Sequence, residues 1–166
     1  LTRNNEPEPY LIADLINNAE RRGEEQQKYD DAVARLYRTI ELIAQYKLKK
    51  EYGINPSKAE TSKIPEELLK KWNVSSETET IKLSLEKDYE LLKAMGNVLG
   101  QKYEDDKQLK NLLSKRNTSI LAHGIEPVDK QTYQQLYMKT LEYAENVVAN
   151  LHQHLKNAKF IKWKNR

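Results

Sequence analysis

The stretch Tyr29–Glu51, YDDAVARLYRTIELIAQYKLKKE, decides the fold. Its apolar residues recur at steps of three and four, which places them on one face of an α-helix. Gly53 follows as a stop signal. A long amphipathic helix of this kind needs other helices to cover its apolar face. The residues of the stripe are Ala32, Val33, Leu36, Tyr37, Ile40, Ile43, Ala44 and Leu48.

The same spacing predicts helices before and after this one. A short helix is expected over Tyr10–Arg22, with Gly23 as its stop signal. A further stripe runs from about Leu85 to Tyr103. Two glycines weaken its second half, so a kink or an early stop is expected there, at Gly96 and Gly100.

Two more helices are expected in the last third of the chain. The first spans Lys107–His123 and is closed by Gly124 and Pro127. Asp129 is a suitable N-cap for the second, whose apolar stripe continues to about Leu155.

Residues 55–83 interrupt the helical pattern with two prolines and a polar tract. We interpret them as an irregular insertion, in which Ile64–Trp72 forms one or two helical turns and Ile81–Leu83 a short extended piece. The predicted fold class is therefore all-α, a bundle of four to five main helices with this insertion.

Composition narrows the functional classes. The 166 residues suit one domain, 1–166, and contain no cysteine, which excludes disulfides, thiolate metal sites and cysteine nucleophiles. The absence of cysteine is compatible with a cytoplasmic protein. No apolar run approaches the roughly 20 residues of a membrane helix. The net charge of +3 is too small to indicate nucleic-acid binding by itself.

The strongest candidate site is Arg116 with His123, supported by Asn117. At 3.6 residues per turn, the arginine and the histidine lie about 20° from alignment and roughly 10 Å apart along the helix. A histidine can exchange protons with the oxygens of a phosphodiester, while the guanidinium holds the phosphate. The expected position of His123 in the last helical turn favours imidazolium. Asn117 can orient a phosphate, a ribose hydroxyl or the histidine.

The string RNTSILAHG at residues 116–124 resembles the arginine-x6-histidine signature of HEPN ribonucleases, including the asparagine after the arginine. Residues 18–22 and 29–41 resemble the opening helices of the CRISPR-associated CARF-HEPN family, of the Csm type found in type III systems. The resemblance covers about residues 14–151 and is least determined over 55–83.

This resemblance implies an HEPN-like bundle and a CRISPR-associated antiviral endoribonuclease. Arg116 and His123 would be catalytic and Asn117 supporting, in a metal-free attack of a ribose 2′-hydroxyl on the adjacent phosphate, with no cofactor. It further implies a single-stranded RNA substrate and a homodimer that pairs two copies of the motif. The chain starts at Leu1 and lacks a preceding CARF sensor domain, so we interpret it as an excised piece. A cyclic oligoadenylate activator is expected only through that domain.

Two alternatives stay open. The chain is also compatible with a non-catalytic helical dimerisation or interaction module, in which Arg116 and His123 have no chemical role. HEPN domains also occur in toxin and antitoxin pairs, so a toxin-type nuclease is a further alternative.

Other polar residues have ordinary structural explanations. Arg35, Arg38 and Glu41 share one predicted helix, where exposed salt bridges are commoner than contacts to a site. His152 and His154 point in different directions on a helix and are assigned no function. The ten tyrosines would suit base stacking, but most fall on apolar stripes, which favours packing.

Overall fold

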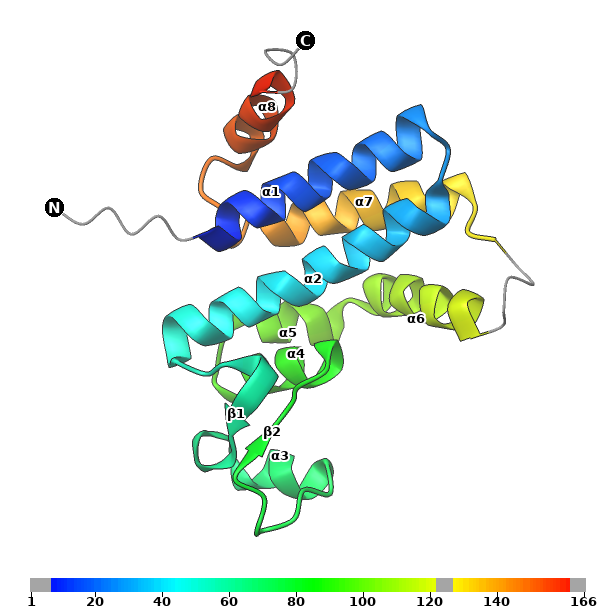
Figure 1. Ribbon diagram of the computed structural model, residues 1–166. Helices are drawn as coiled ribbons and strands as arrows, with labels where there is room; N and C mark the ends of the chain where they lie inside the picture. The colour runs from blue at the N-terminus through cyan, green and yellow to red at the C-terminus, as the bar shows by residue number, and fades with distance from the viewer. Residues whose placement is uncertain (1–6, 122–126, 162–166) are drawn as a thin grey trace, which may run out of the picture. The chain divides into compact units, whose positions relative to one another are not determined.

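The protein is all-α apart from one very short pair of strands, as predicted. The computed structural model describes residues 7–121 and 127–161, with the side chains of 8–117 and 127–159 (Figure 1). The chain divides into two compact units, one of residues 1–42 with 107–166 and one of residues 43–106. Within the described ranges, no helix has the length and the apolar character needed to cross a bilayer.

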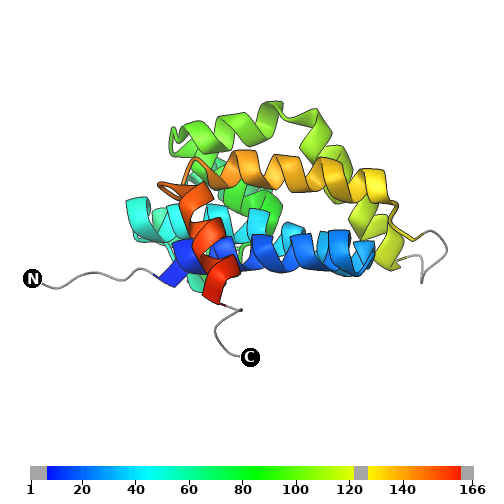
Figure 2. The same cartoon turned by 90° about the horizontal axis from the view of Figure 1, so that it is seen from above.

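The first unit is a group of helices in which α1 has α7 and α8 as neighbours. Figures 1 and 2 show α7 alongside α1. The last helix, α8, crosses α1. Asn17 of α1 donates a hydrogen bond from Nδ2 to the carbonyl of Leu155 at 3.0 Å. The elements are α1 Pro7–Glu20, a π-helical turn Arg21–Glu25, the first part of α2 Tyr29–Tyr52, α6 Lys107–Leu121, α7 Lys130–Ala144 and α8 Leu151–Ile161.

The long helix predicted over Tyr29–Glu51 is confirmed as α2, with one further residue at its end. Seven of the eight stripe residues are fully buried. The exception is Tyr37, which is only half-buried.

Gly23 does not stop the first helix, so this prediction was wrong. The α-helix ends at Glu20 and the chain continues through Gly23 in a π-helical turn to Glu25. Gly23 is buried, and a Cβ built on it would lie 2.2 Å from Cζ of Tyr133. The glycine is therefore needed because an aromatic ring lies directly against the backbone.

The single helix predicted from Asp129 to about Leu155 was also wrong. Asp129 is the N-cap as expected, but α7 ends at Ala144 and α8 begins only at Leu151. The intervening turn includes Asn150 in the left-handed region, with φ of 56°. Apolar periodicity continues across this turn, because Leu151 at the start of α8 is buried as well.

The second unit, residues 43–106, carries the predicted insertion. The stripe from Leu85 to Tyr103 is broken into two helices, as the glycines indicated. Gly100 lets α5 approach α4, because a Cβ there would lie 2.1 Å from the backbone nitrogen of Lys93. The elements are the end of α2, β1 Ala59–Glu60, α3 Glu66–Lys71, β2 Thr80–Ile81, α4 Leu85–Ala94 and α5 Val98–Asp105, with 3-10 turns at Pro56–Lys58 and Thr61–Lys63.

The insertion contains both predicted elements and one that was missed. The helix α3 begins directly after Pro65, and the extended piece is the strand β2. Its antiparallel partner β1 was not predicted and pairs Ala59 with Ile81. The insertion is tied to α4 by Trp72, whose Nε1 donates to Oε2 of Glu90 at 2.6 Å.

Substituting Gly23→Ala should lower the free energy of unfolding by about 1–3 kcal/mol, because the new methyl group overlaps the buried ring of Tyr133. Urea denaturation measures this. The exposed Glu25→Ala in the same turn is the control and should change little. In a Tyr133→Ala background the Gly23→Ala penalty should shrink. An unchanged penalty there would show that the ring is not its cause.

Asp129→Ala should lower the melting temperature at pH 7 by a few degrees, because Oδ1 of Asp129 accepts from the backbone nitrogen of Thr132 at 2.7 Å. Hydrogen bonds from Thr132 lower the pKa of Asp129 below its ordinary value. The stabilisation by the charged cap is therefore present above the unfolded-state pKa and is lost as the pH falls through the folded-state pKa. Melting curves at pH 7 and about pH 3 should show the difference between wild type and Asp129→Ala narrowing at the lower pH, whereas the difference between Asp129→Asn and Asp129→Ala should stay the same, because neither variant titrates there.

Candidate functional site

The candidate site is carried by α6, whose apolar face continues into Arg116. Leu109, Leu112 and Leu113 are buried, as their spacing predicts. Arg116 follows Leu112 and Leu113 by four and three residues, so it takes the next position of the same stripe. An arginine therefore occupies a place where the pattern calls for an apolar residue.

The Arg116 side chain is partly buried, and its guanidinium group contacts two neighbouring residues. Its Nε atom is buried, while the side chain as a whole is half-exposed. Its Cζ lies 4.2 Å from the centroid of the Tyr37 ring, within the range of a cation–π interaction. Its Nη1 donates a hydrogen bond to Oδ1 of the exposed Asn117 at 3.3 Å.

Asn117 accepts a hydrogen bond from Arg116, which was not among the partners expected for its amide. The structure thus brings two of the three predicted site residues together. The third, His123, lies outside the described residues, as does Gly124. The catalytic assignment of Arg116, Asn117 and His123 stays a prediction.

The charged residues of α2 pair with each other, as expected. Arg38 donates from Nη1 to Oε2 of Glu41 at 2.7 Å on the exposed face. Arg35 donates from Nε to Oδ1 of Asn18 at 2.9 Å and lies 3.4 Å from Oδ1 of Asp31. The Arg38–Glu41 and Arg35–Asp31 pairs confirm the helix salt bridges that the spacing predicted, while the contact with Asn18 joins α2 to α1.

Tyr37 is the residue of α2 that reaches Arg116, and sequence reasoning missed it. It was assigned to the apolar stripe and to packing. One signal was present in the sequence: an arginine on the apolar face of one helix requires a partner that tolerates both a cation and burial. The face of a tyrosine ring satisfies both requirements.

Other tyrosines of the same unit pack against one another, which agrees with the packing interpretation. The rings of Tyr29 and Tyr133 lie 5.8 Å apart, and those of Tyr133 and Tyr137 lie 6.0 Å apart. Burial raises the pKa of Tyr137 to about 12, and the carboxylates of Glu20 and Glu24 add to the shift. Burial also raises the pKa of Tyr133. Both phenols therefore stay protonated near neutral pH.

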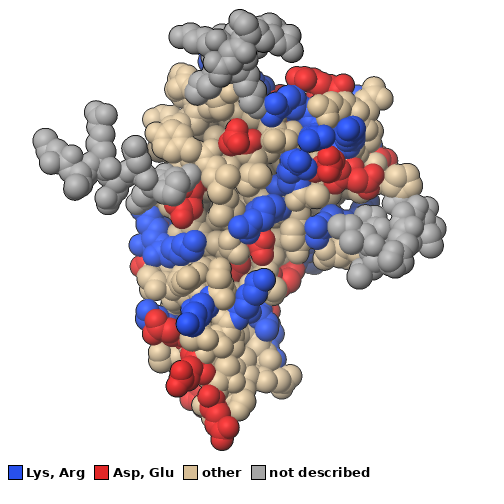
Figure 3. All heavy atoms as spheres, viewed as in Figure 1, with Lys and Arg blue, Asp and Glu red and all other residues tan. Residues whose placement is uncertain are grey.

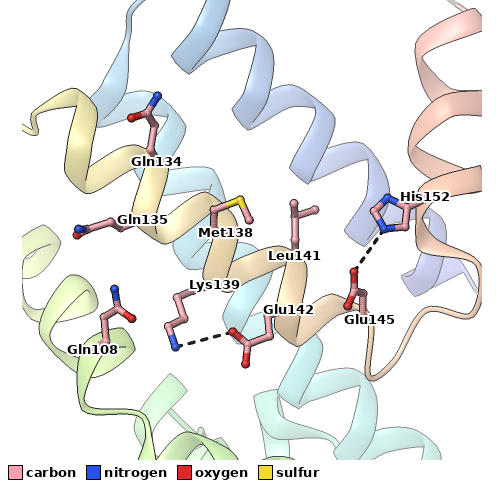
Figure 4. Close-up of a pocket in the computed structure, with 9 residues that line it drawn as sticks. All are labelled: Gln108, Gln134, Gln135, Met138, Lys139, Leu141, Glu142, Glu145 and His152. Carbon is pink, nitrogen blue, oxygen red and sulfur yellow. Dashed lines mark ion pairs between the residues drawn. The ribbon is translucent and has the colours of Figure 1, made fainter.

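A pocket of about 670 Å³ lies beside α7 (Figure 4). Gln108 of α6 and the glutamines at the start of α7 line one end. At the other end, His152 lies 3.5 Å from Glu145 and Lys139 lies 3.8 Å from Glu142. Neither Arg116 nor Asn117 is among the lining residues.

The two histidines of α8 have separate partners. His152 pairs with Glu145, whereas His154 meets the ring of Tyr10 edge-on at 5.2 Å. Within the described part of the chain, no three His, Asp or Glu side chains are grouped to hold a metal ion.

On the face shown in Figure 3, lysines and arginines are interspersed with acidic groups and form no broad basic area. This agrees with the net charge of only +3.

Comparison with known proteins identifies the family. The family model described as the Csm6 HEPN domain matches residues 2–147, which include the whole segment from Arg116 to His123. Searches of curated proteins and of solved structures gave no match. Because the match spans most of the chain, this chain belongs to the Csm6 HEPN domain family of CRISPR-associated proteins, a family of nuclease-type effector domains.

Proposed function

We propose that the chain is a metal-independent endoribonuclease domain that cleaves single-stranded RNA in a cytoplasmic CRISPR-associated defence protein. The observation that carries this proposal is the family match over residues 2–147, which contains the Arg116–His123 string. The half-buried, ring-stacked guanidinium of Arg116 supports it, because a fixed cation suits recognition of a phosphate.

The proposed reaction moves protons between the substrate and imidazole. His123 accepts the proton of a ribose 2′-hydroxyl, and the 2′-oxygen attacks the adjacent phosphorus. The bond from phosphorus to the 5′-oxygen breaks, and an imidazolium protonates that leaving oxygen. Arg116 stabilises the negative charge that develops on the phosphoryl oxygens. The products are a 2′,3′-cyclic phosphate and a 5′-hydroxyl.

The substrate class follows from the nucleophile. DNA lacks the 2′-hydroxyl, so only RNA can react in this way. In-line attack requires the 2′-oxygen, the phosphorus and the 5′-oxygen to align. A backbone that can splay out reaches this alignment more readily than a duplex, which favours single-stranded RNA.

The proposed active unit is a homodimer. A single chain supplies one arginine and one histidine from this string, whereas the reaction uses both a base and an acid. Two copies of the string around one cleft would supply an imidazole for each step and a guanidinium for each side of the phosphate.

His123→Ala and Arg116→Ala should each reduce cleavage of single-stranded RNA at least about 100-fold, because each removes a group that acts in the transition state. Wild-type cleavage should persist in EDTA. Gel assays with end-group analysis measure both effects and should find cyclic phosphate and 5′-hydroxyl ends. A 5′-phosphate product or a strict Mg²⁺ requirement would contradict the mechanism.

Matched controls are available on the exposed surface of the same unit. His152→Ala removes a histidine that is 83% exposed, and Arg38→Ala removes an arginine that is 48% exposed. Both should cleave like wild type. If a folded dimer of the wild type leaves RNA intact, and the full-length protein with its activator is also inert, the non-catalytic interaction module is the better assignment.

Specific activity per chain should fall when the protein is diluted below the dissociation constant of the dimer. The reason is that a lone chain lacks the second histidine and the second arginine. Sedimentation velocity gives the dimer fraction, and cleavage rates at the same concentrations give the activity. Undiminished activity in solutions of monomers would rule out the composite site.

A further inference from the structure

We propose that Tyr37 is a positioning residue for Arg116, holding the guanidinium in place for the phosphate. This inference rests on the proposed ribonuclease function and deepens it. Both residues belong to the same compact unit, Tyr37 on α2 and Arg116 on α6. The contact between them is close, with Cζ of Arg116 4.2 Å from the ring centroid.

The position of Arg116 on α6 makes such a support necessary. It continues the buried stripe of Leu109, Leu112 and Leu113, and its Nε atom is buried. Burying part of a cation is unfavourable unless a partner offsets the lost hydration. The negative face of an aromatic ring does this, and a planar, weakly hydrated guanidinium suits it better than an ammonium group.

The ring restricts a flexible side chain. Arginine has four rotatable side-chain torsions, and fixing them has an entropic cost that otherwise falls on substrate binding. Tyr37 lies against the planar group, and Asn117 accepts a hydrogen bond from Nη1. With two such restraints, the guanidinium is placed before the phosphate arrives.

The test compares Tyr37→Leu with Tyr37→Phe. The leucine variant removes the ring face and should lower kcat about 10- to 100-fold with KM changed less than about threefold, because misplacement weakens transition-state contacts most. The phenylalanine variant keeps the ring face and should stay within about threefold of wild type. Tyr29→Leu removes another half-buried tyrosine of the same helix and serves as the matched control.

A spectroscopic readout separates this inference from the proposed function. Proton NMR of Arg116 should show its side-chain signals shifted upfield by the ring current in wild type and Tyr37→Phe, and the shift lost in Tyr37→Leu. If wild type shows the shift but cleaves no RNA, the proposed function fails and the contact stands. If Tyr37→Leu, folded by its melting curve, cleaves like wild type, or if the shift is absent, the positioning role is overturned.

Discussion

The arrangement of the site depends on an arginine that lies on the apolar face of α6. Removing part of a guanidinium from water is unfavourable, and the ring of Tyr37 on α2 offsets some of that cost. The contact requires both helices to keep their register. A slip of one turn along α2 would replace Tyr37 by Val33 or Glu41, that is, by a residue with no aromatic face or by one that would neutralise the cation.

Helical periodicity predicted most of the fold because burial follows it closely. The stripe of α2 is buried except at Tyr37, and the break between α4 and α5 falls where glycines weaken the pattern. Two predictions failed where the chain departed from its local signals. Gly23 was interpreted as a terminator, whereas its missing side chain makes room for Tyr133. Apolar spacing ran on from α7 into α8, whereas the chain turns at Asn150.

Only the sequence string of the site, residues 116–124, was predictable. The residues of that string indicated phosphodiester chemistry and resembled the family to which the chain belongs. They did not indicate Tyr37, because a tyrosine on an apolar stripe is usually a core residue and its partner is 79 positions away in sequence, at Arg116. Tyr37 and Arg116 come into contact only through the folding of α2 and α6 within one unit. The pairing of Arg38 with Glu41, in contrast, follows from local spacing alone.

The modest net charge bears on the proposed positioning of Arg116. A strongly basic protein gathers RNA through its overall field, which is tolerant of where each cation lies. This chain has a net charge of only +3, with acidic groups between the basic ones on the face shown in Figure 3. Under the proposed function, binding of a phosphate would rely on short-range contacts, whose strength depends on geometry. Where phosphate binding depends on short-range contacts, a cation that is already held in place contributes most to it. Arg116 is held in this way by Tyr37 and Asn117.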